Sequence, residues 1–148
     1  MKNNIRSPWT SLSATIVAVT KTFPFEAVAT AYTMGLRHIG ENRVEEARGK
    51  IEEAKKQGYV DTVWHMVGHV QSRKAREVAE LFDWVDSVDS IELLQKLDAA
   101  AGALHKKLHV LLEVNISGEE NKYGFDVLPK DLKFSNLIIE GLMTMAPL

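Results

Sequence analysis

Apolar stretches of strand length alternate along this chain with stretches whose apolar residues recur every three or four positions. The first apolar stretch, residues 15–20, is rich in β-branched residues and ends at Lys21. The next segment, residues 24–35, has helical spacing and lies between Pro24 and Gly35. A proline suits the first helical turn and a glycine suits the position after the last one. The pattern predicts a buried strand followed by an amphipathic helix.

The same alternation continues to the end of the chain. Further strands are predicted at residues 36–41, 62–68, within 83–90, at 109–116 and at 136–147. Further helices are predicted at residues 42–58, 72–82 and 91–104, and a polar loop at 117–125. Ser72 is the expected N-cap of the third helix. The chain thus has six strand-like segments in one domain.

Strands that alternate with helices indicate βα units and a parallel sheet, and hence an α/β protein. Two architectures remain, an open doubly wound sheet and a (β/α)8 TIM-type barrel. The sequence has neither a G-x-G-x-x-G turn nor a phosphate-binding P-loop, both of which are typical of open sheets. Its polar residues instead follow the strands, where barrel enzymes place their chemistry. These residues favour the barrel: Lys21, Asn42, His65, Asn115 and Thr144.

Composition narrows the class of protein. The chain has 148 residues, of which 45% are hydrophobic and 26% charged, and its net charge is −2. No broad basic field favours nucleic acid as a partner. There is no cysteine, and no apolar run reaches the ~20 residues of a membrane helix. The first residues lack the apolar core of a signal peptide. We therefore expect a cytoplasmic protein that binds neither nucleic acid nor membrane.

Lys21 is the most informative position, because lysine rarely follows a strand that is buried on both faces. Its ammonium group could simply reach solvent while its stem packs. Desolvation at a barrel mouth would instead favour the neutral amine, which attacks a carbonyl carbon and forms a Schiff base. This chemistry serves the attachment of pyridoxal 5′-phosphate (PLP) and also some aldolases.

The other candidate residues allow two interpretations each. Asn42 could cap a helix or contact a ligand. His65 and His69 are four residues apart, but they lie in a strand and a loop, so a hydrogen-bonding role is favoured over a metal site. A basic cluster is either a solvated helix face or a contact for phosphate or an acidic partner; it consists of Arg73, Lys74 and Arg76.

Five segments, in this order, resemble the YggS-like PLP homeostasis protein family: "VAVTKTFP", "GENRVEEA", "WHMVGHVQSRK", "VNISGEENKYGF" and "GLMTMAP". The resemblance implies a fold-type III barrel like the N-terminal domain of alanine racemase. It implies PLP held as a Schiff base on Lys21, a role in intracellular PLP homeostasis without established turnover, and PLP-dependent apoenzymes as partners. It places Asn42 beside the cofactor ring, and puts near the same mouth His65, Asn115 and Met143 or Met145. The alternatives are a fold-type III PLP enzyme resembling amino-acid racemases and a cofactor-free Schiff-base aldolase.

A barrel of this type closes with eight strands, whereas residues 1–148 contain six strand-like segments. We therefore expect an incomplete barrel, either as part of a longer chain or paired with another copy of itself. The resemblance implies that the cofactor phosphate is held in the last two strand-to-helix turns, which these residues lack. Full-length family members are expected to be monomers. The 148-residue chain alone is expected to self-associate and to lose PLP on dialysis.

Overall fold

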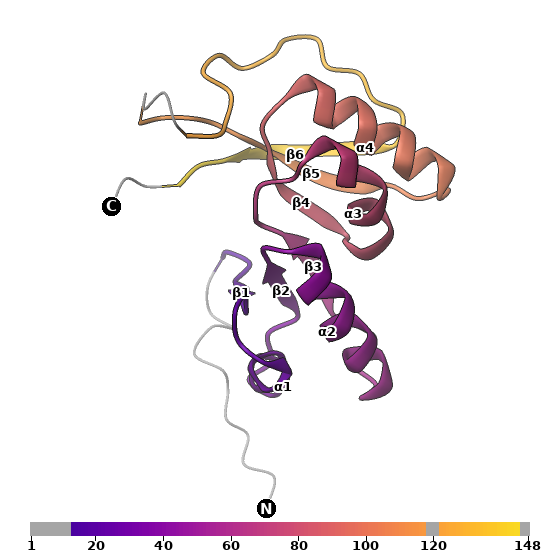
Figure 1. Ribbon diagram of the computed structural model, residues 1–148. Coiled ribbons are helices and arrows are strands. Elements are labelled where there is room, and N and C mark those ends of the chain that lie inside the picture. The colour runs from indigo at the N-terminus through magenta and orange to yellow at the C-terminus, as the bar shows by residue number, and fades with distance from the viewer. Residues whose placement is uncertain (1–12, 118–121, 146–148) are drawn as a thin grey trace, which may run out of the picture.

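The computed structural model describes residues 13–117 and 122–145. Strands and helices alternate along these residues (Figure 1). The strands are β1 (Val17–Val19), β2 (His38–Glu41), β3 (Val63–Met66), β4 (Trp84–Val88), β5 (Leu108–Glu113) and β6 (Leu137–Met143). The helices are α1 (Phe25–Thr33), α2 (Val44–Lys56), the 3-10 turn η2 (Ser72–Lys74), α3 (Ala75–Leu81) and α4 (Ile91–Ala103).

The six strands form one parallel sheet in the order β1-β2-β3-β4-β5-β6. Each strand pairs with the next one along the chain, which is the order of a (β/α)8 barrel. A doubly wound sheet would reverse its strand order at a switch point. The predicted α/β architecture, an incomplete barrel of about six units, is therefore confirmed. Among the described residues, β1 and β6 each pair on one side only.

The hydrophobic core lies between the outer face of the sheet and the helices, which lie along that face in Figure 1. Every second residue of a strand points to this face, as Ile39 and Val110 do, and both are fully buried. The helices contribute the apolar stripes that the sequence predicts, for example Ala47 and Ile51 of α2 and Leu97 of α4. In the described part of the chain, no helix combines the length and the apolar character that crossing a membrane requires.

Two helices end where the sequence predicts. Gly35 follows α1 with φ 89° and Gly58 follows α2 with φ 78°, a left-handed conformation that glycine adopts without a steric cost. The predicted cap of the third helix is wrong. Ser72 lies inside η2, and its hydroxyl donates to Glu92 at 3.0 Å instead of capping a backbone N–H.

Candidate functional site

Lys21 and Asn42 lie side by side at the carboxyl ends of β1 and β2. Val19 pairs with Gly40, and the Thr20 amide donates to the Gly40 carbonyl at 3.0 Å. Lys21 and Asn42 each come two residues after this pair, so the register brings them to the same edge of the sheet. Val17 and Val19 point to the inner face of the sheet, and Lys21 lies in the turn that follows them. The chain thus brings together the two residues that the sequence places at a cofactor ring.

Lys21 itself is exposed. A nucleophilic amine at a barrel mouth is expected to be shielded from water, but in the described structure the side chain of Lys21 is open to solvent. The physical reason is the position of β1, which pairs only with β2 among the described strands. The amine therefore stands at an open edge of the mouth.

Two other predicted residues share a cavity at the far side of the mouth. Asn115 and Met145 line a space of about 120 Å³ beside the ends of β5 and β6. Met143 ends β6 and pairs in register with Glu113 of β5. The hydroxyl of Thr144 donates to the Val114 carbonyl at 3.1 Å, which ties the two strand ends together.

His65 lies deeper, in a row of rings on the inner face. It pairs in register with Gly40, which is two residues before Asn42. Two residues of strand correspond to about 6–7 Å, so His65 is below the level of Lys21. The row consists of His38, His65, Trp84 and His109, with successive ring centroids 5.1, 5.2 and 4.8 Å apart. Strand spacing of about 4.8 Å explains these distances, because the rings belong to four adjacent strands.

Hydrogen bonds fix the buried end of this row. His65 Nδ1 lies 3.0 Å from both carboxylate oxygens of Asp86, and its Nε2 lies 2.9 Å from His38 Nδ1. Both contacts are satisfied when His65 donates to Asp86 and accepts from His38. Burial, followed by the neighbouring His65, lowers the pKa of His38. His65 is therefore engaged inside the barrel.

His69 follows β3 and faces different partners. Its Nδ1 lies 3.0 Å from the Asp89 carboxylate, and its ring stacks on Tyr123 with centroids 3.7 Å apart. Burial, and then the nearby Asp89, raises the pKa of Glu113 at the end of β5. His65 and His69 thus do not converge. Within the described ranges, no three residues of metal-ligand type form a group that could hold an ion.

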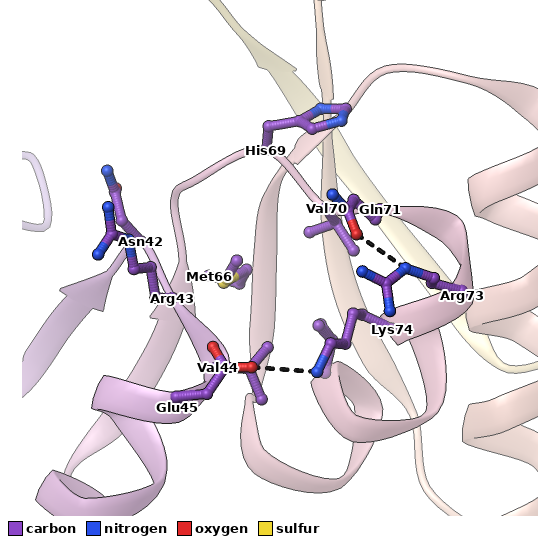
Figure 2. Close-up of a pocket in the computed structure, with 11 residues that line it drawn as sticks. Asn42, Arg43, Val44, Glu45, Met66, His69, Val70, Gln71, Arg73 and Lys74 are labelled. Carbon is purple, nitrogen blue, oxygen red and sulfur yellow. Dashed lines mark hydrogen bonds and ion pairs between the residues drawn. The ribbon is translucent and has the colours of Figure 1, made fainter.

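A polar pocket of about 260 Å³ opens between the β2–α2 and β3–η2 connections (Figure 2). Asn42 lines one side of it, and Arg73 lines the other, where its Nε donates to Gln71 at 2.9 Å. Apolar side chains such as Met66 and Val70 form part of its lining. Asn42 therefore borders both this pocket and Lys21.

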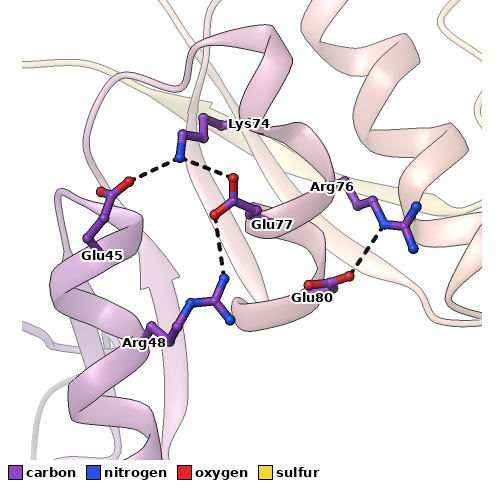
Figure 3. A network of polar contacts seen from close by, with 6 residues as sticks. All are labelled: Glu45, Arg48, Lys74, Arg76, Glu77 and Glu80. Atoms are coloured by element: carbon purple, nitrogen blue, oxygen red, sulfur yellow. Dashed lines mark hydrogen bonds and ion pairs between the residues drawn. The ribbon is translucent and has the colours of Figure 1, made fainter.

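Most of the predicted basic cluster is neutralised on the helix surface (Figure 3). Lys74 binds Glu45 at 3.0 Å and Glu77 at 3.1 Å, and Arg76 lies 3.4 Å from Glu80. These contacts raise the pKa of Lys74. The sequence left open whether this cluster is a solvated helix face or a contact for phosphate or an acidic partner. The ion pairs of Lys74 and Arg76 fit the solvated helix face.

Sequence reasoning missed a buried ion pair beneath Lys21. Glu41 ends β2 and is fully buried, and Lys50 of α2 is only 8% exposed. Lys50 Nζ lies 2.6 Å from Glu41 Oε1 and 2.7 Å from the Thr20 carbonyl oxygen. A signal was present, because Lys50 sits directly beside the apolar stripe of α2 and Glu41 ends a buried strand.

Comparison with known proteins agrees with this architecture. Residues 1–147 match the family model of the alanine racemase N-terminal domain. A PLP homeostasis protein from Synechocystis sp. is 41% identical over 142 residues, which cover 92% of this chain and 64% of that protein. The protein of that name from Escherichia coli K12 is 36% identical over 137 residues, which cover 88% and 58% of the two chains. The chain thus spans about three-fifths of the length of these relatives.

Solved structures show the same fold. PipY of Synechococcus elongatus, with PLP bound, superposes with a TM-score of 0.80 at 38% identity, covering 93% of this chain and 66% of that one. An alanine racemase of Clostridium difficile, at 18% identity, has a TM-score of 0.67 and shares the fold; the match covers 92% of this chain and 37% of the racemase. The alternating strands and helices, the register at Lys21 and the match over residues 1–147 lead to one conclusion: the chain belongs to the alanine racemase N-terminal domain family, and its similar relatives include proteins named PLP homeostasis protein.

Proposed function

We propose that this chain binds PLP as a Schiff base on Lys21 and acts in intracellular PLP homeostasis. The observation that carries the proposal is the register that sets Lys21 beside Asn42 at the carboxyl ends of adjacent strands, in a fold that binds PLP in PipY. A bound PLP supplies an aldehyde that reacts with an amine and a ring that withdraws electrons.

The donor set at the mouth is compatible with this cofactor. Lys21 offers the only amine directly after β1, and Asn42 offers an amide that donates and accepts hydrogen bonds. Gly40 lies two residues before Asn42 on β2 and has no side chain. A Cβ at this position would meet the side chains of Val17, Val19 and Val67 at 3.2 Å, so the glycine keeps the inner face uncrowded. Asn115, Met143 and Met145 belong to the opposite side of the same mouth and are proposed as more distant contacts.

The role we propose is that of a carrier with no efficient turnover of its own. A racemase needs a second acid/base group on the opposite face of the cofactor. His65 is the candidate that the sequence offers, and its two ring nitrogens are engaged with His38 and Asp86. PLP-dependent apoenzymes are the proposed acceptors, and the cytoplasm is the proposed compartment.

The test is trapping of the Schiff base. The chain is mixed with excess PLP, reduced with borohydride and mapped by peptide mass spectrometry. We expect visible absorbance before reduction and cofactor mass mainly on the Lys21 peptide. Lys21→Arg should abolish this label, whereas Lys55→Arg, an exposed lysine on α2, should leave it unchanged. Equal labelling of Lys21 and the other lysines would refute the proposal.

A second measurement separates the carrier from the alternatives. Exchange of the α-hydrogen of amino acids by the PLP-loaded chain should stay at the rate of free PLP. Exchange at an enzyme-like rate that depends on His65 would establish the racemase-like enzyme. Trapping of a keto compound on cofactor-free protein would establish the aldolase.

A further inference from the structure

The backbone on both sides of Lys21 is held by α2 and β2. On the N-terminal side, the Thr20 carbonyl accepts from Lys50 Nζ at 2.7 Å, and the Thr20 hydroxyl donates to Glu41. On the C-terminal side, the Thr22 amide donates to Glu46 Oε2 at 3.1 Å. Two side chains of one helix, Glu46 and Lys50, thus contact the residues that flank Lys21.

The contact at Thr20 comes from a buried charge. Glu41 is fully buried and Lys50 nearly so, and burying either charge without a partner would be strongly unfavourable. The pair therefore fixes the position of the Lys50 ammonium, whose remaining donors can reach the Thr20 carbonyl. The Phe23 amide also donates to this carbonyl, at 3.1 Å. The Thr20 oxygen therefore accepts both from Lys50 and from the far end of the turn that contains Lys21.

The contact at Thr22 holds an unfavourable backbone conformation. Thr22 has φ 63°, a left-handed conformation that is rare for a β-branched residue. Such conformations persist only where the surroundings over-determine them. The Glu46 carboxylate accepts from the amide of this residue, and a charge-assisted hydrogen bond is among the stronger polar contacts.

We propose that Glu46 and Lys50 are positioning residues, which hold the turn around Lys21 so that its amine stays beside Asn42 at the mouth. The part that concerns PLP rests on the function proposed above. Neither side chain needs to touch the cofactor, since both act through the main chain of Thr20 and Thr22.

The variant that tests the C-terminal contact is Glu46→Ala, and the chain offers a matched control in Glu45→Ala. Both carboxylates lie in the first turn of α2, so both variants change the helix terminus alike, but Glu45 binds Lys74 instead of the Lys21 turn. Glu46 also lies 3.7 Å from exposed Arg43, so Arg43→Ala is included to exclude that contact. Glu46→Gln keeps an acceptor oxygen and should rescue.

Two measurements are made on every variant. In cofactor-free protein, hydrogen exchange of the Thr22 amide should accelerate about tenfold in Glu46→Ala and stay unchanged in the three other variants. In borohydride trapping at increasing PLP, half-labelling of Lys21 should need about ten times more PLP in Glu46→Ala, while labelling of the other lysines stays constant. A structural role alone would move global stability but not these two local readouts selectively.

The N-terminal contact is tested in the double variant Glu41→Gln/Lys50→Met, which removes both buried charges and so avoids leaving one unpaired. Circular dichroism and a cooperative melt establish that it folds. If the folded double variant labels Lys21 as the parent chain does, the role of Lys50 is overturned; weaker labelling supports it. Should the double variant not fold, Glu41→Leu/Lys50→Met, which also removes both buried charges and the donor to the Thr20 carbonyl, takes its place under the same criterion.

The outcomes separate the two proposals. Unchanged Thr22 exchange in Glu46→Ala overturns the positioning role, whatever Lys21 binds. Faster Thr22 exchange with no preferential labelling of Lys21 in the parent chain leaves the backbone contact established and refutes the function proposed for Lys21.

Discussion

Replacing Gly68 by alanine should disturb the mouth from a distance, because this glycine lies against the backbone of Asn42. A Cβ at Gly68 would stand 2.9 Å from Asn42 Cα and 3.0 Å from its carbonyl carbon, with the carbonyl oxygen closer still. These atoms belong to main chain and cannot rotate away. Overpacking of this kind costs about 1–3 kcal/mol, and relief requires the β2–α2 turn that carries Asn42 to move.

Gly49 provides the control. It lies in α2, and a Cβ there would meet nothing within 4 Å, so Gly49→Ala should stabilise the chain by about 1 kcal/mol through helix propensity. In thermal unfolding, one kcal/mol corresponds to a shift of about 2–4 °C for a chain of this size. We expect the melting temperature to fall by several degrees in Gly68→Ala and to rise by a few in Gly49→Ala, with weaker trapping at Lys21 only in the former. Equal melting temperatures for the two variants would refute the close approach.

Three further predictions concern charged groups. Lys50→Met should lower the free energy of unfolding in urea by about 3–5 kcal/mol, because it leaves the buried Glu41 carboxylate unpaired; Glu41→Leu/Lys50→Met should recover most of this loss, and a loss as large in the double variant would contradict the reasoning. Because the pKa of His38 is lowered on folding, the unfolded chain takes up the proton first, so stability should fall as pH drops below about 6.5; titration of unfolding free energy in His38→Gln should show a weaker fall over that range. Because the pKa of Glu113 is raised by burial, the folded chain loses stability as pH rises above about 4.5, the region of the unfolded value. Glu113→Gln should therefore unfold at higher urea concentration than the parent at neutral pH and lose that advantage near pH 4.

The sequence was sufficient for the fold because its signals are local. Apolar runs of strand length, the helical spacing between them, and glycines such as Gly35 and Gly58 each act within a few residues. The barrel was favoured over an open sheet for two reasons. Polar residues follow the predicted strands, and the sequence has neither of the glycine-rich phosphate-binding turns that are typical of open sheets. The resemblance of five segments to one family then singled out Lys21 and Asn42, which the register of β1 and β2 sets side by side.

What could not be predicted depends on contacts between distant segments. The Glu41–Lys50 pair joins the end of one strand to the second turn of the following helix, and a charged residue beside an apolar stripe is usually taken as exposed. The exposure of Lys21 depends on which strands flank β1, a property of the whole sheet. Serine is a preferred N-cap residue, but the hydroxyl of Ser72 donates to Glu92 of α4. A tertiary contact here overrides a local preference.

The row of rings on the inner face gives this molecule an optical reporter of its own. Trp84 lies between the imidazoles of His65 and His109, with interplanar angles of 19° and 12°. The two stacked imidazole rings set the surroundings of the indole, and the fluorescence of an indole depends on its surroundings. In a variant that lacks the other two tryptophans, Trp9 and Trp64, the emission of Trp84 would therefore report any separation of β3, β4 and β5 without an added label.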